Sequence, residues 1–264
     1  MMALVIGHMN LAVGAIGGLS AVVVGYLFQN TGLPIWAVVG AGVLVGMACG
    51  LIIGIIVTQA GINSFIVTLG ALSVYLGINY GLTGAVPYTQ IPTAFILLGR
   101  AKVLGAIPLL LFVMLALAPL LYVLFKHTVL GRRILATGGN AEAANLSGIN
   151  IKQVILISHV ISGLLAGVGG VLFVARLGAA HPTIGANWLL TSFAVPIIGG
   201  VALAGGRVSI LGAIFGGILL TLISNALVLL GVNIYWEQFF LGLVLLFAIG
   251  LDRVRAVYAE RRYV

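Results

Sequence analysis

The chain has 264 residues, of which 12 are Lys or Arg and 4 are Asp or Glu, so charged residues make up only 6%. Hydrophobic residues make up 62%, and the mean hydropathy is +1.29. Soluble domains carry roughly a quarter charged residues, so this composition excludes a soluble domain and a disordered chain. The single cysteine, Cys49, excludes a disulfide scaffold. The class that remains is a polytopic membrane protein.

Apolar runs of spanning length follow one another along nearly the whole chain. A transmembrane helix needs about 20 apolar residues, so the runs between Gly, Pro, Asn and charged residues predict eight full spans. They lie near residues 11–29, 34–57, 63–83, 105–126, 151–175, 189–205, 208–230 and 236–251. Residues 1–7 form an apolar stub, which predicts a partial helix whose preceding span is missing. The predicted fold class is therefore all-α, with residues 1–264 forming one transmembrane helix bundle.

Basic residues are distributed unevenly between the two sides that these spans define. One side holds nine of them: Lys126, Arg132, Arg133, Lys152, Arg207, Arg253, Arg255, Arg261 and Arg262. The other side holds three, at positions 100, 102 and 176. Cytoplasmic loops carry the excess of Lys and Arg, so we expect a multi-pass protein of the cytoplasmic (inner) membrane. The loop at 127–150 and a basic tail at 252–264 would be cytoplasmic. The net charge of +8 then reflects topology and contact with the lipid bilayer, and predicts no nucleic acid partner.

Glycines recur at four-residue spacing inside several predicted spans. The repeats are Gly42, Gly46, Gly50 and Gly54, with the pairs Gly14/Gly18, Gly163/Gly167 and Gly212/Gly216. Residues four apart share one helix face, and small residues let helices approach closely in lipid. The spacing therefore predicts tight helix packing, or alternatively smooth faces that slide during gating.

The loop at 127–150 contains the signals of a short helix. Gly139 and the residue before it interrupt the preceding structure, Asn140 is a favourable N-cap residue, and Glu142 falls in the first turn, where the helix dipole favours an anion. Gly148 stands where a left-handed residue is expected after the helix. A helix of about two turns is marginal in water by itself. It is either a connector lying on the surface or a docking element for a cytoplasmic partner.

Four motifs in the same order resemble the ribose-type permeases of bacterial ABC importers. The first three are Ser-Phe-Ile-Val-Thr-Leu-Gly at 64–70, Gly-Arg-Arg-Ile-Leu-Ala-Thr-Gly-Gly-Asn at 131–140 with Ser-Gly-Ile at 147–149, and Ile-Gly-Gly at 198–200 with Gly-Gly-Arg at 205–207. The fourth is Asn-Ala-Leu-Val-Leu-Leu-Gly at 225–231. The resemblance covers about residues 7–252. It implies a permease that works with ATP-binding cassette ATPase subunits, an extracytoplasmic solute-binding protein and a second permease subunit, identical or different.

The resemblance also implies which residues contact the ATPase. The coupling loop would use Arg132, Arg133, Gly139, Asn140, Glu142, Ala143, Ala144, Asn145 and Gly148. Within it, Glu142 and Asn145 would face the ATPase groove. The short outer loops near 84–104 and 177–188 would present the surface for the solute-binding protein.

Three features depart from the family pattern. Asn10 stands where the family usually has Asp in Gly-Gly-Ile-Asp-Leu-Ser-Val-Gly, and Leu189 stands where it tends to place Glu. Members normally have ten helices, whereas this chain would lack the first and most of the second. Either an upstream start codon or a real truncation would account for the shorter N-terminus.

The sequence contains no set of residues typical of an enzyme. It has no Gly-Lys pair, and hence no Walker-type phosphate loop, so the energy of active transport would have to come from a separate subunit. Its four histidines are dispersed, with no His-x-x-x-His pair or neighbouring cysteine. We therefore expect a transport subunit that is not an enzyme and that binds no metal or other cofactor.

Polar side chains within the spans are candidates for a solute pathway, because such groups need a partner or a wet cavity. The candidates are Asn10, Asn63, Thr68, Tyr75, Asn79, Asn187 and Asn225. Thr68, Tyr75 and Asn79 share one helix face, and Asn10 falls at a predicted helix break. Hydrogen bonding between helices is the alternative role for each. Trp188 is expected to anchor at the outer membrane interface.

These observations predict the permease subunit of an ATP-driven importer that moves a simple sugar by alternating access. Neutral amide, hydroxyl and aromatic groups suit such a solute. A furanone-type signal or a nucleoside is an alternative solute. A passive pore and a nonfunctional truncated permease are the alternatives from other classes.

Overall fold

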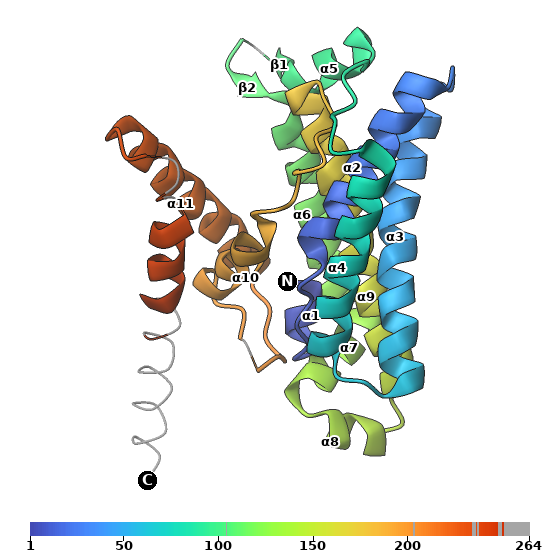
Figure 1. The fold of residues 1–264 in the computed structure, drawn as a ribbon. Coiled ribbons are helices and arrows are strands. Elements are labelled where there is room, and N and C mark those ends of the chain that lie inside the picture. The colour runs from blue at the N-terminus through green and yellow to red at the C-terminus, as the bar shows by residue number, and fades with distance from the viewer. Residues whose placement is uncertain (104, 203, 234–235, 237, 248–249, 251–264) are drawn as a thin grey trace.

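The computed structural model describes residues 1–103, 105–202, 204–233, 236, 238–247 and 250. Its helices are α1 (Met2–Val5), α2 (Val13–Asn30), α3 (Ile35–Ala60), α4 (Ser64–Thr83), α5 (Thr93–Arg100), α6 (Leu109–His127), α7 (Val129–Gly139), α8 (Ala141–Leu146), α9 (Ile151–Leu177), α10 (Trp188–Ile198) and α11 (Ile210–Leu229). A further short apolar helix covers Gln238–Phe247. Two-residue strands β1 (Lys102–Val103) and β2 (Ile107–Pro108) pair antiparallel at one end of the bundle (Figure 1).

The all-α membrane class is confirmed, with fewer helices of spanning length than the sequence predicts. Six helices among the described residues are long and apolar enough to cross a membrane: α2, α3, α4, α6, α9 and α11. The predicted span at 189–205 is an 11-residue helix, α10, which ends at Ile198 before Gly199 and Gly200. The predicted span at 236–251 and the basic tail at 252–264 lie partly or wholly outside the described residues. The N-terminal stub does form a short helix, α1.

Helices α2, α3 and α9 form the tightly packed centre of the molecule. The four glycines spaced along α3 face α9, as their spacing predicts. A side chain at Gly163 would overlap the carbonyl oxygen of Gly46, and one at Gly50 would overlap the carbonyl oxygen of His159. The backbones of α3 and α9 therefore touch directly, which fixes their relative position.

Helices α10 and α11 stand beside this centre (Figure 1). They pack on each other through glycine, because a side chain at Gly212 would overlap the carbonyl oxygen of Gly199. Only Gly216 and Leu220 of α11 are buried, so most of its surface faces outward. The chain thus has a dense centre and a second, more open pair of helices.

The structure also contains elements that the sequence does not predict. Helix α5 and strand β1 lie in the loop expected near 84–104, β2 lies at the start of the span predicted at 105–126, and α7 occupies the first half of the loop at 127–150. The guanidinium of Arg100 donates to the carbonyl oxygens of Arg176 (2.9 Å) and Leu177 (2.6 Å), at the end of α9. We call this end of the bundle the α5 end and the opposite end the α8 end.

Candidate functional site

The helix break that the sequence predicts around Asn10 is present. Helix α1 ends at Val5 and α2 begins at Val13, so residues 6–12 connect them without regular structure apart from turns. Asn10 is only 3% exposed. Its side-chain oxygen accepts a hydrogen bond from the backbone N–H of Ala12 (3.0 Å), and its amide nitrogen donates to the hydroxyl of Ser162 on α9 (3.2 Å). The break is therefore anchored to the middle of α9.

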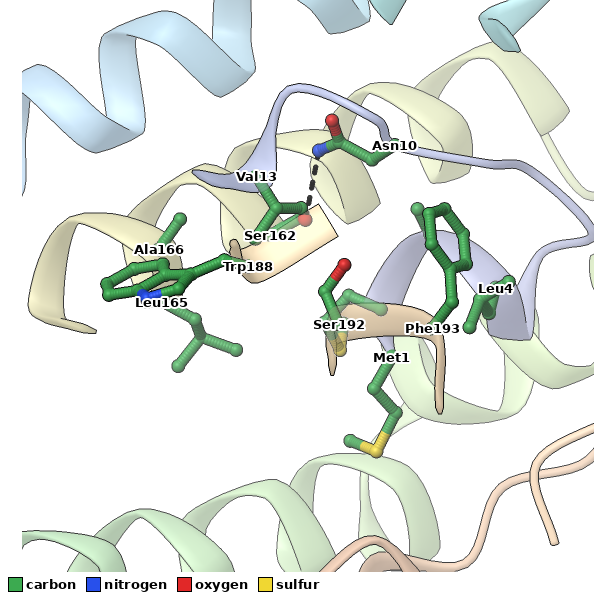
Figure 2. A pocket seen from close by; sticks show the side chains of 12 residues that line it. Met1, Leu4, Asn10, Val13, Ser162, Leu165, Ala166, Trp188, Ser192 and Phe193 are labelled. Carbon is green, nitrogen blue, oxygen red and sulfur yellow. Dashed lines mark hydrogen bonds between the residues drawn. The ribbon is translucent and has the colours of Figure 1, made fainter. Parts of the chain in front are cut away.

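A cavity of about 220 Å³ lies beside this break, and we call it the central cavity. Figure 2 shows that side chains from α1, α2, α9 and α10 surround it, with the Asn10–Ser162 hydrogen bond at one side. Its polar groups are those of Asn10, Ser162, Ser192 and the indole of Trp188. The remaining lining is apolar: Met1, Met2, Ala3, Leu4, Val13, Leu165, Ala166 and Phe193. An apolar pocket with a few convergent polar groups is the usual form of a small-molecule site.

Trp188 corrects one sequence prediction. It was expected to anchor at the outer membrane interface, but its indole instead packs inside the bundle. Its ring lies 5.1 Å from the ring of Phe173, centroid to centroid, and side chains added at Gly17 or Gly169 would contact it. Glycine in α2 and α9 leaves the space that this large ring fills, so Trp188 forms a wall of the central cavity.

Of the two hydroxyl groups of this cavity, the sequence indicates Ser192 as a polar residue within a span but does not indicate Ser162. Ser162 precedes Gly163 in α9, and Ser192 lies four residues after Trp188 on the same face of α10. The four-residue spacing of Trp188 and Ser192 indicates that both lie on one face of a helix. It does not indicate that α9 and α10 meet the break at Asn10.

The three polar residues of α4 share one buried face, and that face packs against other helices. The Thr68 hydroxyl donates to the carbonyl of Ser64 (2.7 Å), one turn earlier, and the Tyr75 hydroxyl to that of Cys49 in α3 (2.9 Å). The Asn79 amide lies against Gly18 of α2 and is fully buried. None of the three lines the central cavity.

The other predicted pathway residues lie elsewhere. Asn63 is the N-cap of α4 and accepts from the backbone N–H of Phe65 (2.8 Å). The side-chain oxygen of Asn187 accepts from the amide of Gln238 (2.8 Å). Asn225 is exposed on α11. Of the seven predicted pathway residues, Asn10 is thus the one that lines the central cavity.

The short helix predicted in the 127–150 loop is confirmed as α8. The side-chain oxygen of Asn140 accepts from the backbone N–H of Ala143 (2.9 Å), and Gly148 adopts the predicted left-handed conformation with φ of 80°. Glu142 lies in the first turn. Ala144 is buried, while the neighbouring positions in α8 are exposed. Leu146, which the sequence analysis did not single out, is 90% exposed.

The rest of the predicted coupling set surrounds α8. Arg132, Arg133 and Gly139 are exposed on α7. Ala143, Asn145 and Gly148, further along the loop, are also exposed. The surface therefore combines basic groups, a carboxylate, an amide and the exposed side chain of Leu146.

The predicted coupling loop at 127–150 is connected to the helix break through a close backbone contact. A side chain at Gly138, near the end of α7, would overlap the carbonyl oxygen of Val5 in α1. The same oxygen accepts a hydrogen bond from the N–H of Gly206 (2.8 Å), whose φ of 75° requires glycine. Helices α7 and α1 are therefore in direct backbone contact, and α1 lines the central cavity.

The chain is similar to known transport permeases over nearly its whole length. Residues 1–249 match the family described as branched-chain amino acid transport system, permease component. The D-allose transport system permease protein AlsC of Escherichia coli (strain K12) is 36% identical over 252 residues, covering 96% of this chain and 77% of that protein. No solved structure matches this chain.

Two further relatives are sugar permeases by name. The galactose/methyl galactoside import permease protein MglC of Escherichia coli (strain K12) is 32% identical over 270 residues, covering 96% of this chain and 80% of that protein. The ribose import permease protein RbsC of Bacillus subtilis (strain 168) is 34% identical over 252 residues, covering 95% and 78%. The family match extends over nearly the whole chain, so the resemblance read from its motifs is confirmed, and the chain belongs to the ABC importer permease family that includes the ribose-type permeases.

Proposed function

We propose that this chain is the membrane-spanning permease subunit of an ATP-driven importer and that a simple sugar passes through its central cavity. The observation that carries this proposal is the position of the cavity at an interrupted helix, beside Ser162 near the middle of α9. Transporters commonly place solute sites where discontinuous helices meet near the bilayer midplane. The relatives named for allose, galactose and ribose support the same solute class.

The chemistry of the cavity favours a neutral solute. None of the side chains that line it carries a charge. A zwitterionic amino acid would bury an ammonium and a carboxylate without a charged partner there, which costs several kcal/mol in a low-dielectric site. Neutral hydroxyl groups need only the amide of Asn10, the serine hydroxyls and the indole N–H. The cavity is thus better suited to a sugar than to the amino acids in the family's description.

The α8 end is assigned to the cytoplasm on the basis of charge and exposed surface. Among the described residues, Lys126, Arg132, Arg133, Lys152 and Arg207 lie at or near this end, against Arg100, Lys102 and Arg176 at the other. Leu146 and Glu142 of α8 would insert into a groove of the ATPase subunit. The solute-binding protein would approach the α5 end, and a second permease subunit, identical or different, would lie alongside in the bilayer.

The proposed cycle follows the contact between the coupling loop and the helix break. ATP binding and hydrolysis in the partner would move α8 and α7, and Gly138 would transmit this movement to Val5 of α1. The break at Asn10 would then open the central cavity to one side or the other. Alternating access by movement of packed helices around a fixed site is a general mechanism of transporters.

The test is solute-stimulated ATP hydrolysis by the complete importer in liposomes, with its own ATPase and binding protein. The panel contains D-allose, D-galactose and D-ribose, with leucine for the amino acid alternative. We expect stimulation by one sugar and none by leucine. Glu142→Lys and Leu146→Asp should abolish stimulation, whereas Val129→Asp, at an exposed position of α7 outside α8, should retain it.

Two results would contradict the proposal. Stimulation by leucine alone would assign the cavity to amino acids. Failure of the folded chain to assemble with any ATPase would remove the importer function altogether.

A further inference from the structure

A second cavity, of about 680 Å³, lies on the other side of the break between α1 and α2. It is lined by Gly7, His8 and Met9 of the break, by the α3–α4 turn from Gly61 to Phe65, and by Val57 and Ile155. Because Ile155 lies in the first turns of α9 and Gly61 follows the end of α3, this cavity is at the α8 end. Ile62 and Phe65 in its wall are 42% and 45% exposed, so it opens to the outside of the bundle at that end.

The break separates this cavity from the central cavity. Asn10 lines the central cavity, and His8, two residues earlier, lines the second one. The backbone carbonyl of Met9, between them, lies 3.4 Å from the Thr68 hydroxyl at the start of α4. A single segment of five residues, 7–11, therefore forms the partition, and it follows directly on α1, which contacts the coupling loop.

The imidazole groups beside this cavity have hydrogen-bonding capacity that the described protein does not use. The Nδ1 atom of His8 is buried without a partner, as are both ring nitrogens of His159. The two rings lie 5.9 Å apart, centroid to centroid, and His159 is fully buried. The imidazole of His8 lines the cavity, and its other ring nitrogen, Nε2, is not among these buried atoms, so Nε2 is the atom that can hydrogen-bond to a polar guest.

The α3–α4 turn adds the groups that complete a site for a neutral hydroxylated compound. The side-chain oxygen of Asn63 is held by the N–H of Phe65 (2.8 Å), which leaves its NH₂ group available to donate. The ring of Phe65 supplies an apolar surface. The site thus pairs donors and acceptors with an aromatic face and has no charged lining residue.

We propose that this cavity is an exit site, where a sugar pauses between the central cavity and the cytoplasm and hydrogen-bonds to His8 and Asn63. The inference rests on the proposed function, because it assumes that the solute is a sugar and that the α8 end is cytoplasmic. Movement of residues 7–11 would connect the two cavities when α7 pushes on α1. His8 is then a solute-binding residue of the exit route.

Protection of an engineered cysteine tests this site in the complete importer. The native Cys49 is buried and is replaced by alanine, and Ile62→Cys introduces a thiol in the cavity wall. A membrane-impermeant maleimide is added from the α8 side in liposomes. With the stimulating sugar at about ten times its half-saturating concentration, labelling should slow about tenfold, in proportion to site occupancy. Val129→Cys, 54% exposed at the same end, should be labelled equally with and without sugar.

Variants of the binding residues separate direct contact from a change of conformation. His8→Leu and Asn63→Asp should each remove the protection of Ile62→Cys, and sugar-stimulated ATP hydrolysis is measured in parallel. Asp at position 63 still accepts the N-cap hydrogen bond but cannot donate. His8→Gln, which keeps one donor and one acceptor, should restore part of the protection.

The outcomes distinguish this inference from the proposed function. Unchanged labelling of Ile62→Cys, in an importer whose ATPase responds to the sugar, would show that the cavity holds water only and would overturn the exit site alone. Protection that survives His8→Leu and Asn63→Asp would also overturn it. Absence of any sugar response in the ATPase would overturn the proposed function and the exit site with it.

Discussion

The two parts of the bundle differ in how their helices are held. In the centre, 61% of the residues in the membrane-spanning stretch of α2 are buried. The backbones of α3 and α9 touch through paired glycines. In α11 only 11% of the residues in the membrane-spanning stretch are buried. The central cavity lies between these parts, because Asn10 and Ser162 come from the dense centre and Trp188 and Ser192 from α10.

In the proposed mechanism, this difference allows a solute site to be both well defined and mobile. Close-packed helices cannot deform gradually, so the centre holds Ser162 in a fixed position, whereas Asn10 belongs to the irregular segment 6–12. The pair α10–α11 has fewer buried residues, so movement of this pair against the centre would disturb fewer contacts. Such movement would change the width of the cavity.

The largest effect is expected from a side chain at the glycine contact of the centre. Gly163→Val should destabilise the folded protein by about 3 kcal/mol or more, because overpacking forces backbones apart. Gly77→Val in α4, where nothing lies within 4 Å of the added Cβ, is the matched control and should change little. Denaturation in detergent measures the stability of both variants. Equal stability of the two variants would mean that the centre is not close-packed.

A large functional effect is expected at the break. Asn10→Leu should lower sugar-stimulated ATP hydrolysis about tenfold, which corresponds to about 1.4 kcal/mol of lost interaction. The physical cause is the loss of a polar cavity group and of the partner of the Ser162 hydroxyl. Asn10→Gln keeps the amide and serves as the control. Full activity of Asn10→Leu would place the solute pathway elsewhere.

A smaller effect is expected on the α10 side of the cavity. Ser192→Ala should lower the same activity only about twofold to threefold, because the hydroxyl already donates to the carbonyl of Leu189 within its own helix (2.8 Å) and offers the solute only lone pairs. The rate of ATP hydrolysis as a function of sugar concentration measures this loss. A loss as large as that of Asn10→Leu would show that α10 carries the recognition.

The smallest functional effect is expected at the α5 end. Arg100→Gln should destabilise the protein by about 1 kcal/mol, since two exposed hydrogen bonds to the end of α9 are lost, without changing ATP hydrolysis. Lys102→Gln, in the exposed β1 strand, is the control and should leave stability unchanged. Loss of stimulation by the binding protein in Arg100→Gln would instead place this residue in the docking surface.

The sequence determined much of the local structure. The low charge and apolar runs predict an all-α membrane protein, glycine spacing predicts a face of α3 that packs closely on another helix, and Asn140 predicts the start of α8. The break at Asn10 is also predicted. These features depend on residues close together in the chain, where helix period and capping chemistry act directly.

Only the tertiary structure decided which helix faces meet. The polar face of α4, with Thr68, Tyr75 and Asn79, packs against α2 and α3, while Ser162 and Ser192 line the central cavity. Membrane helices are apolar on all sides, so their sequences do not distinguish a face that contacts lipid from one that contacts protein. The length of α10 likewise became clear only where Gly199 ends it against α11. Helix period fixes which residues share a face, and packing of distant segments fixes what that face contacts.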